Sequence, residues 1–392
     1  MDPILNPYAP GAGSRPPVLT GRDKEIEAFK ILVARLRSGR SAKSLMITGL
    51  RGVGKTVLLT TFRDIAENAG FQTGNAEITH ETDFKGAMAR LSRRILISLS
   101  SLEKAKDRLL QAARVLKAFT LKMPDGFELG ITVDALRGRA DSGLLSDDLS
   151  DVFTALGEAA QEQKTGIIFF LDEIQFLKRP DLEALIAAAH QASQRNLPLA
   201  VVGAGLPQLP RLAGEAKSYA ERLFDFPRID KLGREAAKEA LEKPAREQQA
   251  SYDAEAINVI LDYTKGYPYF LQEYGKHVWN RAQGPMITKE DAEASRPHVM
   301  AHLDENFFSV RVGRTTRAER HYIQAMANLG EGPYKTGDIA ARLGKETTSM
   351  GPLRAHLINK GLIYSPSHGI MDFTVPKFDD FMRRNYPPES GP

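Results

Sequence analysis

The apolar positions of the N-terminal half form two alternating kinds of run. Some runs are short and continuously apolar, as in strands buried on both faces, and others repeat every three to four residues, as in helices. The strand-like runs cover residues 45–48, 71–79, 166–171, 197–205 and 226–229, and the helical runs cover residues 24–38, 83–102, 149–163 and 217–224. This alternation predicts an α/β fold, a three-layer sandwich in which a parallel sheet carries helices on both faces.

The C-terminal part follows a different pattern. Residues 230–298 are helical in period with no strand-like run, which predicts a small helical lid, and residues 300–312 continue as a linking helix. Beyond them the order changes to a helix, a helix–turn–helix and a two-stranded hairpin, the order of a winged helix. The helices are expected at residues 317–327, 336–343 and 348–360, and the hairpin strands at residues 361–364 and 370–375.

These patterns divide the chain into successive regions. The Pro- and Gly-rich residues 1–18 are expected to be an extended arm rather than a packed element. A nucleotide-binding base is expected over 19–229, with an insertion at about 104–146 that holds a hairpin of residues 119–121 and 127–133. The lid and linker occupy 230–310, the winged helix 311–385, and a disordered tail 386–392.

The first strand leads directly into residues 49–56, GLRGVGKT. This is the phosphate-loop pattern G-x-x-x-x-G-K-[ST] in its strand–loop–helix context. Glycines at 49, 52 and 54 let the backbone turn tightly and direct its N–H groups inward, and the next helix adds the positive end of its dipole. Lys55 is placed to reach the β- and γ-phosphates, and the Thr56 hydroxyl to hold Mg²⁺. The nucleotide-binding residues expected here are Gly49, Arg51, Gly52, Val53, Gly54, Lys55, Thr56 and Val57.

Another buried strand, GIIFFL, ends in two acids, Asp172 and Glu173. A fully buried strand has no reason to end in this way unless the acids act at the carboxyl edge of the sheet. Asp172 is therefore expected to hold Mg²⁺, largely through water, and Glu173 to polarise the attacking water. The alternative is that both acids only start the following helix.

Composition limits the remaining possibilities. The chain of 392 residues has no cysteine, which excludes disulfides and thiolate metal sites and is compatible with the cytoplasm. The N-terminus lacks the pattern of a signal peptide, and no apolar run approaches a membrane span. The net charge of +4 is small, but residues 85–122 hold ten basic against two acidic residues, and residues 311–385 twelve against seven. Either excess could contact phosphates or be a solvated surface.

The two nucleotide motifs, the lid and the winged helix together resemble an AAA+ ATPase of the initiator type, as in archaeal origin-recognition proteins and related bacterial ATP-binding proteins. The resemblance covers about residues 20–385 and implies ATP as the nucleotide and Mg²⁺-dependent ATP hydrolysis. Its adenine-cupping motif falls on Leu19, Gly21 and Arg22, where the alternative is an ordinary helix start. Its arginine that reaches a neighbouring subunit's γ-phosphate falls best on Arg222; Arg228 is a second candidate, and a surface ion pair is an equally good account of Arg222.

Two departures from that pattern stand out. The fourth strand ends without the usual polar sensor residue, and Gln208 is the nearest polar side chain. The lid lacks the sensor arginine and instead has GYPYF at residues 266–270, which resembles the GxP motif of STAND-type signalling ATPases and implies that Pro268 packs near the base. With both sensors altered, hydrolysis is expected to be slow and the protein to act as a switch.

Two functions follow. In the first, an ATP-dependent protein binds double-stranded DNA and forms a homo-oligomer on ATP or DNA. The winged-helix residues expected to face the DNA are Ser349, Met350, Arg354, Lys360 and His368. In the second, a STAND-like signalling or defence switch uses the winged helix as a module for a protein partner, although no effector or repeat domain accompanies it. Neither function involves a membrane.

Overall fold

The computed structural model describes residues 1–11, 13–100, 106–121 and 133–387. The chain divides into two compact units. One unit, which we call the sheet unit, consists of Asp23–Thr48 and Leu58–Arg228. The other, the loop–lid unit, consists of Met1–Arg22, Gly49–Val57 and Ile229–Pro392. The phosphate loop therefore belongs to the same unit as the lid and the C-terminal residues.

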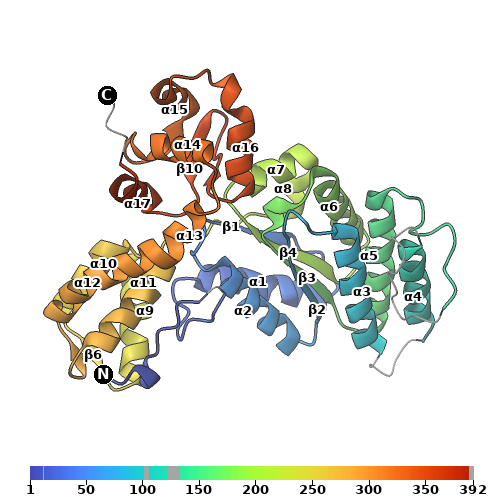
Figure 1. The fold of residues 1–392 in the computed structure, drawn as a ribbon. Coiled ribbons are helices and arrows are strands. Elements are labelled where there is room, and N and C mark those ends of the chain that lie inside the picture. The colour runs from blue at the N-terminus through green and yellow to red at the C-terminus, as the bar shows by residue number, and fades with distance from the viewer. Residues whose placement is uncertain (12, 101–105, 122–132, 388–392) are drawn as a thin grey trace. The chain divides into compact units, whose positions relative to one another are not determined.

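The sheet unit is built on a parallel sheet (Figure 1). Its strands follow the order β2-β3-β4-β1-β5, so β1 and β3 flank β4 and their carboxyl ends lie at the same edge. The strands are β1 (Ser44–Thr48), β2 (Gln72–Glu77), β3 (Ile167–Asp172), β4 (Leu199–Gly205) and β5 (Phe224–Asp225). The predicted α/β class with a parallel sheet is confirmed.

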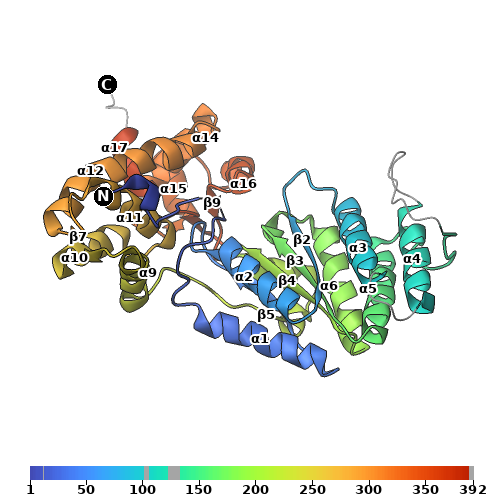
Figure 2. The same ribbon diagram turned by 90° about the horizontal axis from the view of Figure 1, so that it is seen from below.

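Helices cover both faces of this sheet, α1 and α2 on one side and α3, α5 and α6 on the other (Figures 1 and 2). Neighbouring residues of a strand point to opposite faces, and β3 shows this clearly. Phe169 stacks on Phe153 of α5 at 4.8 Å, whereas Phe170 lies 6.1 Å from Phe29 of α1, which in turn stacks on Phe62 of α2. The helices of this unit are α1 (Asp23–Arg37), α2 (Lys55–Asn68), α3 (Phe84–Ser100), α4 (Lys106–Thr120), α5 (Leu145–Glu162), α6 (Arg179–Gln194), α7 (Leu209–Ala216) and α8 (Ala220–Leu223), with a 3₁₀ turn at Ile174–Phe176.

Helix α4 replaces the hairpin that we expected in the insertion. It packs against α3 and α5 as an outer layer (Figure 2). Its buried residues Ala112, Leu116 and Phe119 recur at intervals of four and three, which is the helical period. The expectation of a strand at 119–121 was therefore wrong; of the second expected strand, 127–132 lie outside the described residues.

The lid in the loop–lid unit comprises α9 (Arg234–Glu247), α10 (Ala254–Thr264), α11 (Pro268–Arg281) and α12 (Lys289–Leu303). Contrary to expectation, two short strands interrupt it, β6 (Ser251–Tyr252) and β7 (Met286–Ile287), which pair in parallel. The N-terminal arm also packs on the lid, although we expected it not to pack. Tyr8 is buried, accepts a hydrogen bond from the Tyr252 hydroxyl at 2.7 Å and donates one to the Leu241 carbonyl.

A π-helical turn (Asp304–Phe308) and α13 (Ser309–Val312) lead from the lid to the C-terminal domain, by which we mean residues 314–387. Its helices α14 (Arg317–Ala327), α15 (Thr336–Leu343) and α16 (Gly351–Asn359) appear in the order expected of a winged helix. The antiparallel sheet, in the order β8-β10-β9, adds a strand that we had not expected. The strands are β8 (Tyr334–Lys335), β9 (Ile363–Tyr364) and β10 (Ile370–Phe373), a 3₁₀ turn (Thr348–Met350) precedes α16, and α17 (Phe378–Asn385) follows. None of the helices in the described parts is both long and apolar enough to cross a membrane.

Candidate nucleotide site

The phosphate loop has the backbone geometry that its glycines predicted. Gly52 and Gly54 have φ angles of 82° and 95°, a region that residues with a side chain rarely adopt. Lys55 begins α2 and is buried, and its amine donates hydrogen bonds to the carbonyls of Gly49 at 3.0 Å and Leu50 at 2.9 Å. The cation of the loop is therefore held inside the turn, close to the backbone that would surround a phosphate.

Residues just before α1 fasten this loop to the start of the lid. The Arg22 guanidinium donates to the Val53 carbonyl at 3.0 Å and to the Asp230 carbonyl at 2.6 Å. The Thr20 hydroxyl donates to the Ala236 carbonyl of α9 at 2.8 Å. Leu19, Gly21 and Arg22 were expected to cup the adenine, and this role stays a prediction. In the structure, the Arg22 side chain links the phosphate loop to the start of the lid.

The GYPYF segment of the lid lies directly against the phosphate loop. The Tyr269 N–H donates to the Gly52 carbonyl at 3.3 Å, and a Cβ added at Gly52 would lie 3.1 Å from the Tyr267 ring. Pro268 is the first residue of α11, where its missing N–H is tolerated. Gly266 cannot carry a side chain, because a Cβ there would overlap the Leu232 carbonyl.

The C-terminal domain also contacts the loop. The Arg51 N–H donates to the carbonyl of the buried Thr374 at 3.0 Å. A Cβ added at Gly361 would overlap the Arg51 guanidinium, so that side chain crosses the turn between α16 and β9. A residue of the phosphate-loop motif is thus in direct contact with the domain expected to carry the output.

Two arginines, Arg51 and Arg311, lie close together beside the phosphate loop. Arg311 of α13 lies 3.8 Å above the Phe307 ring, and burial together with the neighbouring Arg51 guanidinium lowers the pKa of Arg311 to about 10. The Tyr267 hydroxyl, close to both arginines, is buried and has no hydrogen-bond partner among the described residues. Burial raises the pKa of Tyr267, so it stays a neutral donor. Two neighbouring cations and a free donor beside the glycine turn suit an anionic phosphate chain.

The two acids that the sequence singled out lie in the sheet unit, at the carboxyl end of β3. Glu173 has a φ of 52°, a left-handed conformation that costs energy for a residue with a side chain. Its N–H donates to the Asp172 carboxylate at 2.8 Å. The bend directs the chain away from the strand immediately after the two acids.

Sequence reasoning missed Gln175. Its amide nitrogen donates to the Glu173 carboxylate, and its amide oxygen accepts from the Leu206 N–H at 3.1 Å. Gln175 therefore joins the proposed catalytic carboxylate to the end of β4, where the expected sensor residue is lacking. Gln208, which the sequence marks as the nearest polar side chain, is buried. The only sequence signal was a polar residue two positions after the acids.

Arg222 lies on α8 and is exposed. It lines a cavity of about 480 Å³ together with Arg35, Lys43 and Asp225. Lys43 and Asp225 form an ion pair at 3.2 Å. Because these residues adjoin the amino end of β1, Arg222 lies at the edge of the sheet opposite to the end of β3. Its proposed action on a neighbouring subunit stays a prediction.

The expected DNA-facing residues differ from one another in their surroundings. Ser349 and His368 are exposed, and the Arg354 guanidinium is 3.5 Å from the Thr347 carbonyl. Met350, however, is 4% exposed, which corrects the expectation that it faces outward. The Lys360 amine binds the carboxylate of the buried Glu319 at 2.6 Å and the Arg314 carbonyl at 2.8 Å, so it is part of the domain's own structure.

Two family models match separate parts of the chain. Residues 18–202 match the AAA ATPase domain family, and residues 305–382 match a domain of unknown function, DUF8462. The chain thus contains an AAA ATPase domain, which implies ATP binding. No curated protein matches the chain.

Among solved structures, a Walker-type ATPase of Pyrococcus abyssi is similar to 94% of this chain over 97% of its own, with a TM-score of 0.58 and 15% identity. At that identity the likeness concerns the fold alone. The RuvB Holliday junction branch migration motor of Thermotoga maritima (93% and 95% covered) and the Orc1 protein of Aeropyrum pernix in complex with DNA (94% and 93%) both have a TM-score of 0.45 and 15% identity.

Proposed function

We propose that this protein is an ATP-hydrolysing switch, in which the nucleotide held by the phosphate loop controls the C-terminal domain. The observation that carries the proposal is the hydrogen bond from the Arg51 N–H to the Thr374 carbonyl, with the Arg51 side chain packed at Gly361. A loop that closes on phosphates must change its backbone conformation. Such a change would move Arg51, and with it the two segments that Arg51 contacts, the turn between α16 and β9 and the end of β10.

The chemical roles follow from the residues of each unit. Lys55 and the loop N–H groups bind the β- and γ-phosphates, and Thr56 and Asp172 hold Mg²⁺. When bound, Mg²⁺ neutralises charge on the phosphates. Glu173 polarises the attacking water, and Gln175 fixes the orientation of its carboxylate. Arg222 acts on the nucleotide of a second subunit in a homo-oligomer.

The output that we propose first is binding of double-stranded DNA by the C-terminal domain. Ser349, Arg354 and His368 support it, because they lie at the start of α16, on that helix and at the β9–β10 tip, the elements with which a winged helix meets DNA. The second candidate is a module for a protein partner. It is favoured by Met350 and Lys360, which are engaged within the domain instead of facing outward.

Hydrogen exchange can test the switch. A non-hydrolysable ATP analogue should change the protection of residues 361–375 in the wild type and in Glu173→Gln, and should not do so in Lys55→Ala. Arg51→Ala keeps the backbone bond to Thr374 but loses the side-chain contact at Gly361, so at saturating analogue it should show a smaller response than the wild type. Equal protection of residues 361–375 with and without the bound analogue would contradict the proposal.

DNA binding can be measured separately. A duplex-DNA affinity that depends on the nucleotide and falls steeply with salt supports the first output. Affinity without salt dependence, or none at all, supports the protein module.

A further inference from the structure

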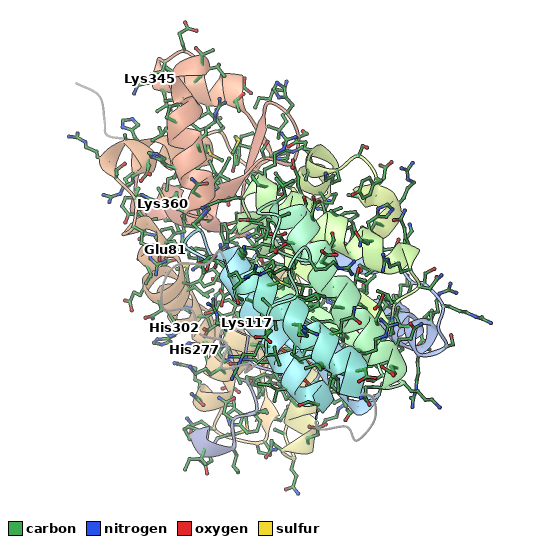
Figure 3. All side chains as sticks on the ribbon, turned by 90° about the vertical axis from the view of Figure 1, so that its right-hand side faces the viewer. Glu81, Lys117, His277, His302, Lys345 and Lys360 are labelled. Carbon is green, nitrogen blue, oxygen red and sulfur yellow. The ribbon has the colours of Figure 1, made fainter. Side chains whose placement is uncertain are left out.

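A second cluster of chemically active side chains lies in the lid, outside the residues assigned to the nucleotide. It consists of Glu273 and His277 on α11 and His302 near the end of α12. Figure 3 labels the two histidines. One ligating atom from each residue lies within 4.8 Å of the other two. His302 Nδ1 is 3.5 Å and His277 Nε2 3.8 Å from the same oxygen, Glu273 Oε2.

These three atoms are buried, and none has a hydrogen-bond partner in the described part of the chain. The Glu273 side chain is only 2% exposed. Buried polar atoms nearly always have a partner, and a buried carboxylate without one is costly. Three such atoms that converge on one point indicate a shared partner that is not part of the chain.

The spacing suits a metal ion. Zinc binds histidine nitrogen and carboxylate oxygen at roughly 2.0–2.2 Å, so neighbouring ligand atoms of a tetrahedral site are about 3.4 Å apart. The separations of 3.5 and 3.8 Å from Glu273 Oε2 exceed this value by about 0.1 and 0.4 Å. Glu273 and His277 are four residues apart on one helix, which places them on the same face.

The surroundings of the cluster also resemble those of a metal centre. The Tyr269 hydroxyl donates to the second oxygen of Glu273 at 2.9 Å, which leaves Oε2 to face the two imidazoles. His277 and His302 have side chains that are 25% and 34% exposed, which gives an ion a path from solvent.

We propose that Glu273, His277 and His302 bind one divalent transition-metal ion, with Zn²⁺ the favoured ion and water as its fourth ligand. The ion joins α11 to the end of α12. It also fixes the helical turn that carries Tyr269, whose N–H donates to Gly52 of the phosphate loop. Tyr269 thus connects the proposed metal site to the phosphate loop, because it contacts both Glu273 and Gly52. The two sites share no ligand residue.

The test uses the full chain without an affinity tag, stripped with a chelator and kept free of nucleotide. Titration with Co²⁺ should give the visible bands of a tetrahedral ion at one equivalent, and Zn²⁺ should displace it. Saturation with Zn²⁺ should slow hydrogen exchange of the α11 amides, because the bound ion stabilises the folded lid. Glu273→Gln and His302→Gln should each weaken Zn²⁺ binding by about 100-fold or more, whereas Tyr269→Phe, which loses only the supporting hydrogen bond, should weaken it ~10-fold.

The matched control is His298→Gln, which removes an exposed histidine one turn before His302 and should leave the affinity within about twofold. Absence of a one-to-one Co²⁺ spectrum in the wild type would overturn the proposal, whether or not the variants fold. So would wild-type affinity in both ligand variants, or an equal loss in the His298 control, since metal would then bind wherever histidines are exposed.

Discussion

Replacing Lys360 by methionine should destabilise the C-terminal domain rather than weaken contacts with DNA. The amine is 2.6 Å from the carboxylate of Glu319, a side chain that is 2% exposed. Removing one partner of a buried ion pair costs ~3–5 kcal/mol, because the other charge stays buried and unpaired. A third of the Lys360 side chain is exposed, so water can replace part of the interaction, and we expect a loss of about 2 kcal/mol.

The chain consists of two compact units, so a single unfolding midpoint would mix their stabilities. Hydrogen exchange of the α14 amides, which follow the Thr316 cap held by Glu319, reports on the affected domain alone. A loss of about 2 kcal/mol corresponds to a roughly 30-fold faster exchange. Lys345→Met, at an exposed site in the same domain, is the matched control and should leave exchange unchanged (Figure 3).

The effect should depend on pH with a definite sign. Burial opposes ionisation of Glu319, but hydrogen bonds from Lys360 and Thr316 outweigh it and lower its pKa. A carboxylate whose pKa is lower in the folded state than in the unfolded state stabilises the fold at pH values above its unfolded pKa of about 4.3. This stabilisation is lost as the pH falls through the folded-state pKa. The difference between wild type and Lys360→Met should therefore be complete at neutral pH and shrink below about pH 4.

Two outcomes would refute this reasoning. One is exchange in Lys360→Met equal to that of the wild type at neutral pH. The other is a fall of about one in the salt slope of DNA binding, the result expected if the amine contacted a phosphate. If the reasoning holds, adding Glu319→Gln to Lys360→Met should restore much of the lost protection, because no unpaired charge then stays buried.

Three further predictions concern catalysis. Lys55→Ala should abolish ATP binding or hydrolysis, whereas Glu173→Gln should bind ATP and retain it unhydrolysed; unchanged turnover in either, measured by phosphate release, would remove the assignment. Gln175→Ala should lower turnover about 10-fold at unchanged ATP affinity, because the Glu173 carboxylate loses its orientation; an altered affinity with normal turnover would argue against this role. If Arg222 acts between subunits, the ATPase rate per chain should rise with protein concentration, and Arg222→Ala should flatten that rise. A rate that is independent of concentration in both proteins would mean that Arg222 is only a surface residue.

The sequence predicted the features that depend on local order. The glycine positions of the phosphate loop, the acids at the end of β3 and the alternation of strands and helices are all written within short stretches of chain. Errors arose where a local pattern was ambiguous. Residues 119–121 look like a strand by themselves, and only the spacing of Ala112, Leu116 and Phe119 identifies a helix. Met350 was expected to face outward because Leu353 and Leu357 were assigned to the inward face of a helix over 348–360, whereas α16 begins only at Gly351.

Features made by distant residues could not be predicted in this way. The Gln175 side chain is held by a hydrogen bond from the Leu206 N–H. The Lys360 amine is paired with Glu319, 41 residues away in the sequence. Two-residue strands such as β6 and β7 are too short to show a period. Glu273 and His277 have the spacing of a helical pair, but nothing in the sequence relates them to His302 on the next helix.

Tyr269 connects the lid to the phosphate loop, so a change in the loop on nucleotide binding should affect the lid. Its backbone N–H is bound to Gly52, and its hydroxyl is bound to Glu273 on the next turn of the same helix. Gly52 is followed closely by the loop residues that meet a phosphate and preceded by Arg51, which contacts Thr374. A backbone adjustment at Gly52 must therefore displace α11, lengthen one of these hydrogen bonds or move the Arg51 contact with the C-terminal domain. The Arg51 hydrogen bond to Thr374 is 3.0 Å long, shorter than the 3.3 Å bond between Tyr269 and Gly52, so movement of Arg51 should be transmitted to the C-terminal domain. We therefore expect the nucleotide state to affect that domain.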